Sequence, residues 1–249
     1  MNHRLRMCIR TAIFYPVLVA TSGLLGTMAI LTLFITRNSN IGHWYARLWG
    51  YIQVKVGGVK VIVRGIDKIN TKQAYVYMAN HQSWFDIFVL LAYIPGQFRW
   101  LAKEELYRIP IVGKAMKLIG YIPIDRSNRT KAFESLTKAA EQIRMGTSVM
   151  IFPEGTRSKD GVLQAFKKGG FILAIQSQQP ILPISISGTH KVMPKGKWMI
   201  TPGQVIITIH DPVSTEAIGL KDRQQLIEIV RSRILQGLSP EEQGIARAA

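Results

Sequence analysis

The sequence has little of what several kinds of functional site require. Its 249 residues include a single cysteine, Cys8. This excludes an internal disulfide framework and any zinc or iron–sulfur site built from several cysteines. Four common motifs are also absent: the G-x-S-x-G elbow, the G-x-x-x-x-G-K-[ST] phosphate loop, the G-x-G-x-x-G fingerprint and H-E-x-x-H. Elbow-type serine hydrolases, P-loop NTPases, dinucleotide-binding folds and zincins are therefore disfavoured.

Negative charge is scarce. The chain has 32 Lys and Arg residues against 15 Asp and Glu residues, a net charge of +17, and its first acidic residue is Asp67. Such an excess of positive charge indicates an anionic partner: nucleic acid, an anionic membrane surface or a phosphorylated substrate. No nucleic-acid-binding module is recognisable, and the basic residues are spread along the chain rather than gathered in a stripe. The sequence therefore predicts no nucleic-acid partner.

Charge is missing altogether from residues 11–36, an apolar segment flanked by Arg10 and Arg37. About 20 apolar residues suffice to cross a bilayer as a helix. The segment is longer than the apolar region of a signal peptide and lacks a cleavage motif. Residues 41–59 mix aromatic and basic side chains, as is typical of a membrane interface. We predict a membrane anchor, either one spanning helix or a helical pair that dips into one leaflet.

The pattern changes near residue 60 to alternating strands and helices. Runs rich in Val, Ile and Tyr predict strands at residues 60–64, 74–79, 98–102, 121–124, 148–152, 181–186 and 205–210. Several runs are apolar throughout, which is typical of strands covered on both faces. Helical spacing predicts helices over 128–144 and 221–235. We predict an α/β domain over 59–249, with a mixed, mostly parallel sheet flanked by helices, after a membrane-anchoring helical segment over 1–58.

The first chemically suggestive segment, N-H-Q-S-W-F-D, follows the second predicted strand at residues 80–86. His81 would then lie at the carboxyl end of a strand, where open α/β sheets bind ligands. Asp86 can meet it only if His81 precedes a helix and Asp86 occupies the first turn. We therefore predict Ser83 as the N-cap and Asp86 as the third helical residue. The pair would act as a general base oriented by a carboxylate; alternatively, Ser83 and Asp86 form a capping box without catalytic function.

Three further motifs lie C-terminal to this segment. F-P-E-G-T-R-S at residues 152–158 is a turn in which Gly155 lets the backbone approach a ligand and Arg157 offers a planar fork for phosphate. G-Y-I-P-I-D-R at 120–126 ends in an Asp-Arg pair, and I-L-P-I-S-I at 181–186 predicts a core strand. Taken singly, a surface turn, an exposed ion pair and a buried strand also explain these three motifs.

Together, the four motifs resemble the glycerolipid acyltransferase family, and most closely its bacterial 1-acylglycerol-3-phosphate acyltransferases, over about residues 60–210. The resemblance implies that His81 is the general base and Asp86 its partner. It also implies that the fourth motif, through Pro183, serves the acyl donor, although Ser185 stands where many members have proline. The substrate-binding residues that it implies are Lys103, Arg126, Glu154, Gly155, Thr156 and Arg157.

The resemblance implies acyl transfer from a thioester of acyl-carrier protein or coenzyme A to the 2-hydroxyl of 1-acylglycerol 3-phosphate, which gives phosphatidic acid. Thiolate is a good leaving group, so we expect direct attack without an acyl-enzyme, and no metal or organic cofactor. The expected partners are lysophosphatidic acid, the acyl donor and membrane lipids. The expected location is a membrane, the bacterial inner membrane with the catalytic domain on the cytoplasmic side. Two alternatives stay open: another lysolipid acceptor, such as lyso-ornithine lipid, or a non-catalytic membrane protein that binds anionic lipid.

Overall fold

The computed structural model describes residues 3–125 and 129–245. Within these ranges it describes every side chain except those of residues 3 and 129–133. Its helices are α1 (His3–Thr36), α2 (Ser39–Val56), α3 (Phe85–Tyr93), α4 (Val112–Ile119), α5 (Arg129–Arg144), α6 (Lys168–Ser177), α7 (Thr189–Val192) and α8 (Arg223–Gln236). Its strands are β1 (Lys60–Arg64), β2 (Val76–Ala79), β3 (Phe98–Lys103), β4 (Ile122–Ile124), β5 (Ser148–Ile151), β6 (Ile181–Ser187) and β7 (Gln204–Ile209). Each predicted strand is therefore present, with ends that differ by at most two residues.

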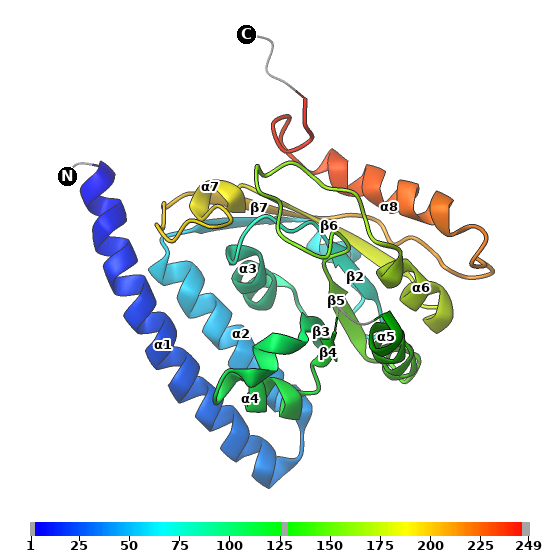
Figure 1. Cartoon of the computed structure of the whole chain (residues 1–249), viewed down its shortest axis with the longest axis horizontal. Coiled ribbons are helices and arrows are strands. Elements are labelled where there is room, and N and C mark those ends of the chain that lie inside the picture. Colours follow the sequence, from blue (N-terminus) through cyan, green and yellow to red (C-terminus); the bar gives the residue numbers. More distant parts are fainter. Residues whose placement is uncertain (1–2, 126–128, 246–249) are drawn as a thin grey trace.

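The strands form one sheet in the order β1-β7-β6-β2-β5-β3-β4 (Figure 1). Neighbouring strands pair in parallel, except that β6 and β7 pair antiparallel. The predicted fold class, a mixed and mostly parallel sheet flanked by helices, is confirmed. The antiparallel strand β7 lies between β6 and β1 at one side of the sheet.

Helices cover both faces of the sheet, and two apolar cores result. Side chains alternate along the second strand, so Tyr77 joins a core shared with α1 to α4, whereas Val76 and Met78 join a core shared with α5, α6 and α8. Every residue of β2 and of β5 is buried. This burial on both faces explains why the central strands are apolar throughout instead of alternating with polar residues.

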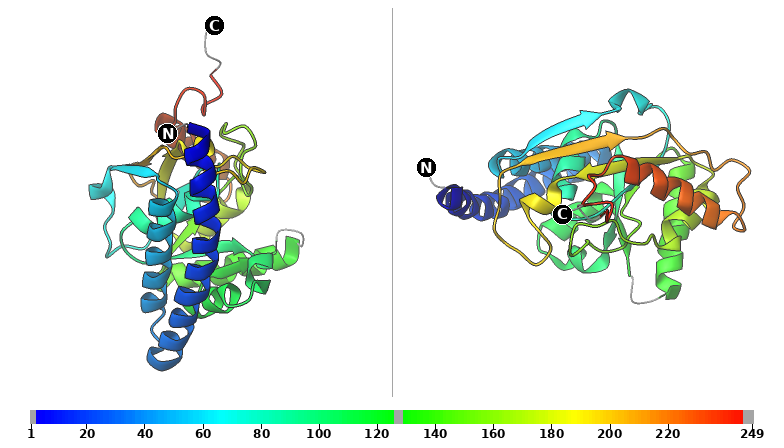
Figure 2. Two further views of the ribbon diagram at one scale, coloured as in Figure 1. Left: turned by 90° about the vertical axis from the view of Figure 1, so that its left-hand side faces the viewer. Right: turned by 90° about the horizontal axis from the view of Figure 1, so that it is seen from above.

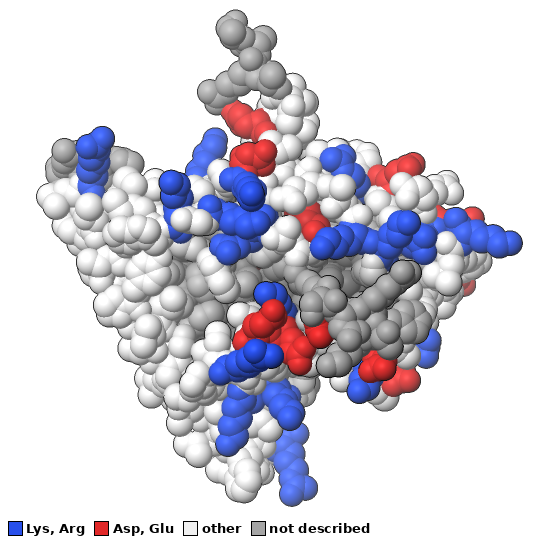
Figure 3. Space-filling view, in the orientation of Figure 1, with Lys and Arg blue, Asp and Glu red and all other residues white. Residues whose placement is uncertain are grey.

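Helices α1 and α2 form an antiparallel hairpin along one side of the molecule (Figure 2, left). The first helix begins eight residues before the predicted apolar segment, and Phe14 and Leu33 on its inner face are buried in the first core. By length and composition, α1 is the one helix in the described residues that is apolar enough to cross a membrane. Its outer face carries Val19, Leu31 and Phe34 and forms a surface almost free of charge (Figure 3).

The parallel strands carry the candidate residues to one edge of the sheet. His81 follows β2, Glu154 follows β5, Thr189 follows β6, and Lys103 is the last residue of β3. These four strands run in the same direction, so their carboxyl ends meet at the same edge. The topology thus brings together motifs that lie more than 70 residues apart in the sequence.

Candidate functional site

His81 and Asp86 are in contact at this edge. The Nδ1 atom of His81 lies 2.8 Å from the Oδ2 atom of Asp86, whose side chain is fully buried, while 14% of the His81 side chain is exposed. The imidazole ring also stacks on Phe152, with ring centroids 3.8 Å apart and planes that differ by 6°. The contact with Asp86 and the stacking on Phe152 therefore fix the orientation of the imidazole ring. The other ring nitrogen, Nε2, takes no part in the contact with Asp86.

The Asp86 carboxylate is surrounded by donors. Its Oδ2 atom accepts from the backbone N–H groups of Gln82, at 2.6 Å, and Ser83, at 2.8 Å. Its Oδ1 atom accepts from the Thr189 hydroxyl at 2.5 Å. Because a carboxylate only accepts, His81 must donate through Nδ1 in this contact. This sets the imidazole tautomer with the lone pair on Nε2, the form that a general base requires.

The predicted helix start is wrong by one residue. Helix α3 begins at Phe85 with Trp84 at the N-cap, so Asp86 is the second helical residue and Ser83 lies outside the helix. The physical reason is a tighter first turn, closed by bonds between residues three apart: the Asp86 N–H donates to the Ser83 carbonyl at 3.4 Å and the Ile87 N–H to the Trp84 carbonyl at 3.2 Å. The Ser83 hydroxyl still accepts from the Phe85 N–H at 3.2 Å, as a capping side chain does, and donates to the Met193 carbonyl at 2.7 Å. Asp86 accepts from the Ser83 N–H, as the acidic residue of a capping box does. The Asp86 side chain therefore both caps the helix start and contacts His81.

Glu154 joins the third motif to the first. Its Oε1 atom accepts from the His81 N–H at 2.6 Å and its Oε2 atom from the Gln164 N–H at 3.0 Å. In addition, the Ser158 N–H donates to the His81 carbonyl at 2.8 Å. Burial raises the pKa of the Glu154 carboxyl to about 7, against the lowering effect of its two backbone donors. Glu154 therefore holds the backbone of His81 rather than facing open solvent.

The raised pKa of Glu154 should make the free energy of unfolding depend on pH. With a pKa raised from 4.5 to about 7, the folded protein binds more protons than the unfolded chain within that window, so stability falls as pH rises through it. The shift corresponds to about 3 kcal/mol. In Glu154→Gln, the loss of unfolding free energy between about pH 4.5 and 7 should shrink by up to that amount. Denaturant titrations in detergent would measure it, and equal losses in both proteins would contradict the assignment.

The turn at residues 154–157 is flanked by cations. The Arg157 guanidinium lies over the Trp84 ring, 5.1 Å from its centroid. Lys195 donates through Nζ to the Thr156 hydroxyl at 3.0 Å and to the Arg157 carbonyl at 2.8 Å. Gly155 has a positive φ of 74°, and a Cβ atom there would lie 2.9 Å from the Lys167 side chain. Such a turn, with a guanidinium and ammonium groups around it, suits a phosphate ligand.

Lys103, Pro183 and Arg126 are the remaining residues to which the sequence analysis gave a role in substrate binding. Lys103 shares the edge and pairs with Glu105 at 2.8 Å on the surface. Pro183 is buried within β6 in register with Met78, and its carbonyl accepts from the His210 N–H at 3.0 Å. Arg126 lies outside the described residues. In the same motif, the Tyr121 hydroxyl lies 3.0 Å from Nδ1 of the buried His43.

Four residues at or near this edge were given no role by the sequence analysis: Asn80, Lys167, Thr189 and Lys195. The Asn80 amide donates to the Ile186 carbonyl at 2.8 Å and accepts from its N–H at 2.7 Å, which ties the end of β2 to β6. Thr189 follows a buried strand, as His81 does, so the same signal could have found it. Lys167 and Lys195 lie in a loop and a coil without such a signal.

The fold and the site define a class: an α/β protein with a carboxylate-oriented histidine and a cationic turn at the carboxyl edge of its sheet. The chain belongs to the acyltransferase family, whose profile matches residues 60–187. The match includes His81, Asp86 and the 154–157 turn. It ends at Ser187, the last residue of β6, so α1, α2, α7, β7 and α8 lie outside it.

Similar proteins carry a more particular name. The 1-acyl-sn-glycerol-3-phosphate acyltransferase of Limnanthes douglasii is 31% identical over 211 residues, covering 84% of this chain and 74% of that protein. A human enzyme of that name, the alpha form, is 35% identical over 72% of this chain and 63% of its own length. The crystal structure of the 1-acyl-sn-glycerophosphate acyltransferase PlsC from Thermotoga maritima has a TM-score of 0.83 at 28% identity, with both chains fully covered.

Other relatives are longer. The chloroplastic 1-acyl-sn-glycerol-3-phosphate acyltransferases of Brassica napus and Arabidopsis thaliana are both 36% identical over 69% of this chain. The chain spans about half the length of these two relatives, 50% and 48%. The family is thus established for the α/β domain.

Proposed function

We propose that this protein transfers an acyl group from an acyl thioester to the 2-hydroxyl of 1-acylglycerol 3-phosphate, forming phosphatidic acid. The observation that carries the proposal is the 2.8 Å contact between His81 Nδ1 and the buried Asp86 carboxylate. The cationic turn at Arg157 belongs to the same unit, because Glu154 and Ser158 both bond the His81 backbone. The names of the similar proteins support the choice of acceptor.

The reaction follows from the tautomer of His81. Its Nε2 lone pair takes the proton of the acceptor 2-hydroxyl while the oxygen attacks the thioester carbonyl. Asp86 stabilises the imidazolium that forms, through the Nδ1–H contact. Collapse of the tetrahedral intermediate breaks the carbon–sulfur bond, and the thiolate leaves with the proton from Nε2. The products are the 2-acyl ester and a free thiol, so no covalent acyl-enzyme is needed.

Arg157 is proposed to hold the acceptor phosphate. Arg157→Lys keeps the charge but loses the planar fork, so the acceptor KM should rise more than the donor KM. Loss of one charge-assisted hydrogen bond is worth about 1.5–3 kcal/mol, or roughly ten- to a hundredfold. Steady-state kinetics with each substrate varied in turn would measure the two constants. A raised donor KM with an unchanged acceptor KM would assign Arg157 to the thioester carrier instead.

A panel of acceptors tests the function itself. Purified full-length protein would be mixed with lysophosphatidic acid, with a lysophospholipid whose phosphate bears a choline headgroup, and with lyso-ornithine lipid, each with both donor types. We expect phosphatidic acid from the first acceptor and little product from the others, because Arg157 and Lys103 favour an exposed phosphate. Preferred acylation of lyso-ornithine lipid would overturn the proposed acceptor, and no transfer to any acceptor would favour the non-catalytic alternative.

We further propose that α1 lies in one leaflet of the membrane, with the bacterial inner membrane and the cytoplasmic side as its setting. Support comes from packing along much of the length of the helix. The Ile200 N–H donates to the Thr11 hydroxyl at 3.0 Å, the Trp49 indole to the Ser22 hydroxyl at 3.0 Å, and the Thr32 and Tyr45 hydroxyls lie 3.1 Å apart. A helix perpendicular to the bilayer would carry these neighbours into the hydrocarbon with it.

Thiol accessibility separates the two arrangements. The native Cys8 is exposed near one end of α1, and Arg37→Cys in a Cys8→Ser background would report the other end. In sealed vesicles of one orientation, an impermeant maleimide should reach both positions from the same side if α1 lies in one leaflet. Labelling of the two cysteines from opposite sides would establish a spanning helix.

A further inference from the structure

One segment connects the catalytic pair to the membrane helix. We name residues 189–203, which comprise α7 and the coil that leads to β7, the strap. At its first end the Thr189 hydroxyl donates to Asp86, and the Met193 carbonyl accepts from the Ser83 hydroxyl at 2.7 Å. Lys195 donates to the Arg157 carbonyl. The strap therefore contacts both motifs of the site.

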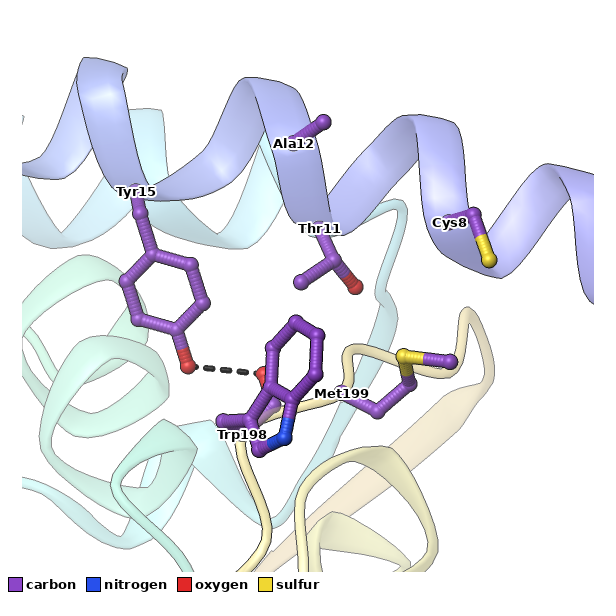
Figure 4. Close-up of a pocket in the computed structure, with 6 residues that line it drawn as sticks. All are labelled: Cys8, Thr11, Ala12, Tyr15, Trp198 and Met199. Atoms are coloured by element: carbon purple, nitrogen blue, oxygen red, sulfur yellow. Dashed lines mark hydrogen bonds between the residues drawn. The ribbon is translucent and has the colours of Figure 1, made fainter.

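At its second end the strap is bonded to α1. The Tyr15 hydroxyl donates to the Trp198 carbonyl at 2.7 Å (Figure 4). The Ile200 N–H donates to the Thr11 hydroxyl at 3.0 Å. The strap also closes on itself, because the Thr201 N–H donates to the Val192 carbonyl at 2.9 Å. A short chain of hydrogen bonds and covalent links thus runs from Tyr15 to Asp86.

Between the strap and α1 lies a mostly apolar hollow of about 340 Å³, lined by Cys8, Thr11, Ala12, Tyr15, Trp198 and Met199 (Figure 4). Two-thirds of the Trp198 surface is exposed, at 67%. Nearby on α1, the exposed side chains Ile9 and Ile13 belong to the same turns that line the hollow. The hollow is therefore continuous with the apolar outer face of α1.

We propose that the strap is a second membrane contact, in which Trp198 enters the interface and a lipid acyl chain occupies the hollow beside it. Tryptophan favours the headgroup level of a bilayer because its ring is apolar and its N–H is polar. Lys197, which precedes Trp198, is exposed, and its ammonium group can pair with a lipid phosphate. Membrane contact at Trp198 then holds the strap against α1, and Tyr15 acts as a positioning residue for Asp86. This coupling rests on the proposed function of the site.

Depth-dependent quenching tests the membrane contact without any activity measurement. In a Cys8→Ser background, Trp198→Cys would be labelled with an environment-sensitive fluorophore and mixed with vesicles of anionic phospholipid that carry doxyl groups at known depths. The control is Leu220→Cys, at an exposed position in the segment before α8. This segment lies at the opposite side of the molecule from α1 (Figure 1). We expect quenching at 198, strongest from shallow doxyl positions, and little at 220. Equal signals at the two positions would overturn the contact.

A matched pair of tyrosines tests the coupling. Tyr15→Phe removes the hydrogen bond to the Trp198 carbonyl of the strap. Tyr45→Phe removes a hydrogen bond to Thr32 that joins α2 to α1 and does not involve the strap. On vesicles, Tyr15→Phe should accelerate hydrogen exchange at the Gln82 and Ser83 amides, which bond Asp86, and should lower kcat about two- to tenfold with little change in acceptor KM. Tyr45→Phe should leave both unchanged.

The outcomes separate the inference from the function on which it rests. Equal exchange rates in the two tyrosine variants would contradict the coupling, even in a fully active enzyme. A wild-type protein that makes no phosphatidic acid would contradict the proposed function, while quenching at 198 and the exchange comparison would still decide the role of the strap. Thermal unfolding of both variants shows whether either change acts through general loss of stability.

Discussion

His81→Ala is expected to lower kcat by about 10²–10⁴-fold, the usual contribution of a positioned general base. No other residue of the four motifs offers an imidazole at this edge. The fold should persist, because the bonds of residue 81 to Glu154 and Ser158 use its backbone N–H and carbonyl, which alanine retains. The measurement is steady-state acyl transfer together with circular dichroism and membrane binding.

His210→Ala is the matched control for this variant. His210 lies after β7, which runs antiparallel to β6, so it is at the opposite edge of the sheet. The Ser185 hydroxyl donates to the Ile234 carbonyl at 2.6 Å, so it accepts from the His210 Nε2 atom, which lies 2.7 Å away. We expect His210→Ala to affect stability more than kcat. Near-normal turnover in His81→Ala would remove His81 from the mechanism.

Asp86→Asn is expected to lower kcat about ten- to a hundredfold, since the contact between a carboxylate and an imidazolium is worth about 1.5–3 kcal/mol. An amide presents one oxygen where Asp86 presents two. If that oxygen faces His81, the tautomer survives but the imidazolium loses its counter-charge. If the amide nitrogen faces His81 instead, Nδ1 must accept and the proton moves to Nε2, where it blocks the base.

The capping interpretation forecasts a different result for Asp86→Asn: slightly lower stability and intact turnover, because asparagine is acceptable at a helix start. Thermal stability and kcat measured on the same preparation distinguish the two. Thr189→Val is the matched control, since it removes the donor to Oδ1 but keeps the carboxylate on His81. We expect it to reduce kcat less than Asp86→Asn. A stable Asp86→Asn protein with normal turnover would leave Asp86 a structural residue.

Local patterns were sufficient to predict much of this architecture. Strands such as β2 and β5 are buried on both faces, so their apolar runs mark them directly, and the polar residue after each run marks the edge where ligands bind. The start of α3 was predicted one residue early because its first turn is closed by bonds between residues three apart before regular α-helical bonding begins. Side-chain spacing indicates which residue can cap a helix, but it does not indicate how tightly the first turn is wound.

The strap was not predicted because its contacts join residues that lie far apart in the sequence. Lys195 and Trp198 stand in a coil without periodicity, and the bond from Ile200 to Thr11 joins residues 189 positions apart. Arg99 is a second case: it is buried and has no acidic partner among the described residues. Its guanidinium donates to its neighbours Gln97 and Phe98, and across the molecule to Ser39 and Asn40 at the start of α2. Hydrogen bonds between residues far apart in the sequence carry no signal in composition or spacing.

A single-turnover experiment tests the central claim most directly. Excess purified enzyme would be mixed with a donor labelled in its acyl chain, with and without lysophosphatidic acid, and quenched at successive times for analysis of lipid and protein. We expect the label to pass directly to the 2-position of phosphatidic acid in the wild type, to remain on the donor in His81→Ala, and never to accumulate on the protein. A labelled protein that forms without acceptor at the rate of turnover, or equal transfer by His81→Ala, would contradict direct attack assisted by His81.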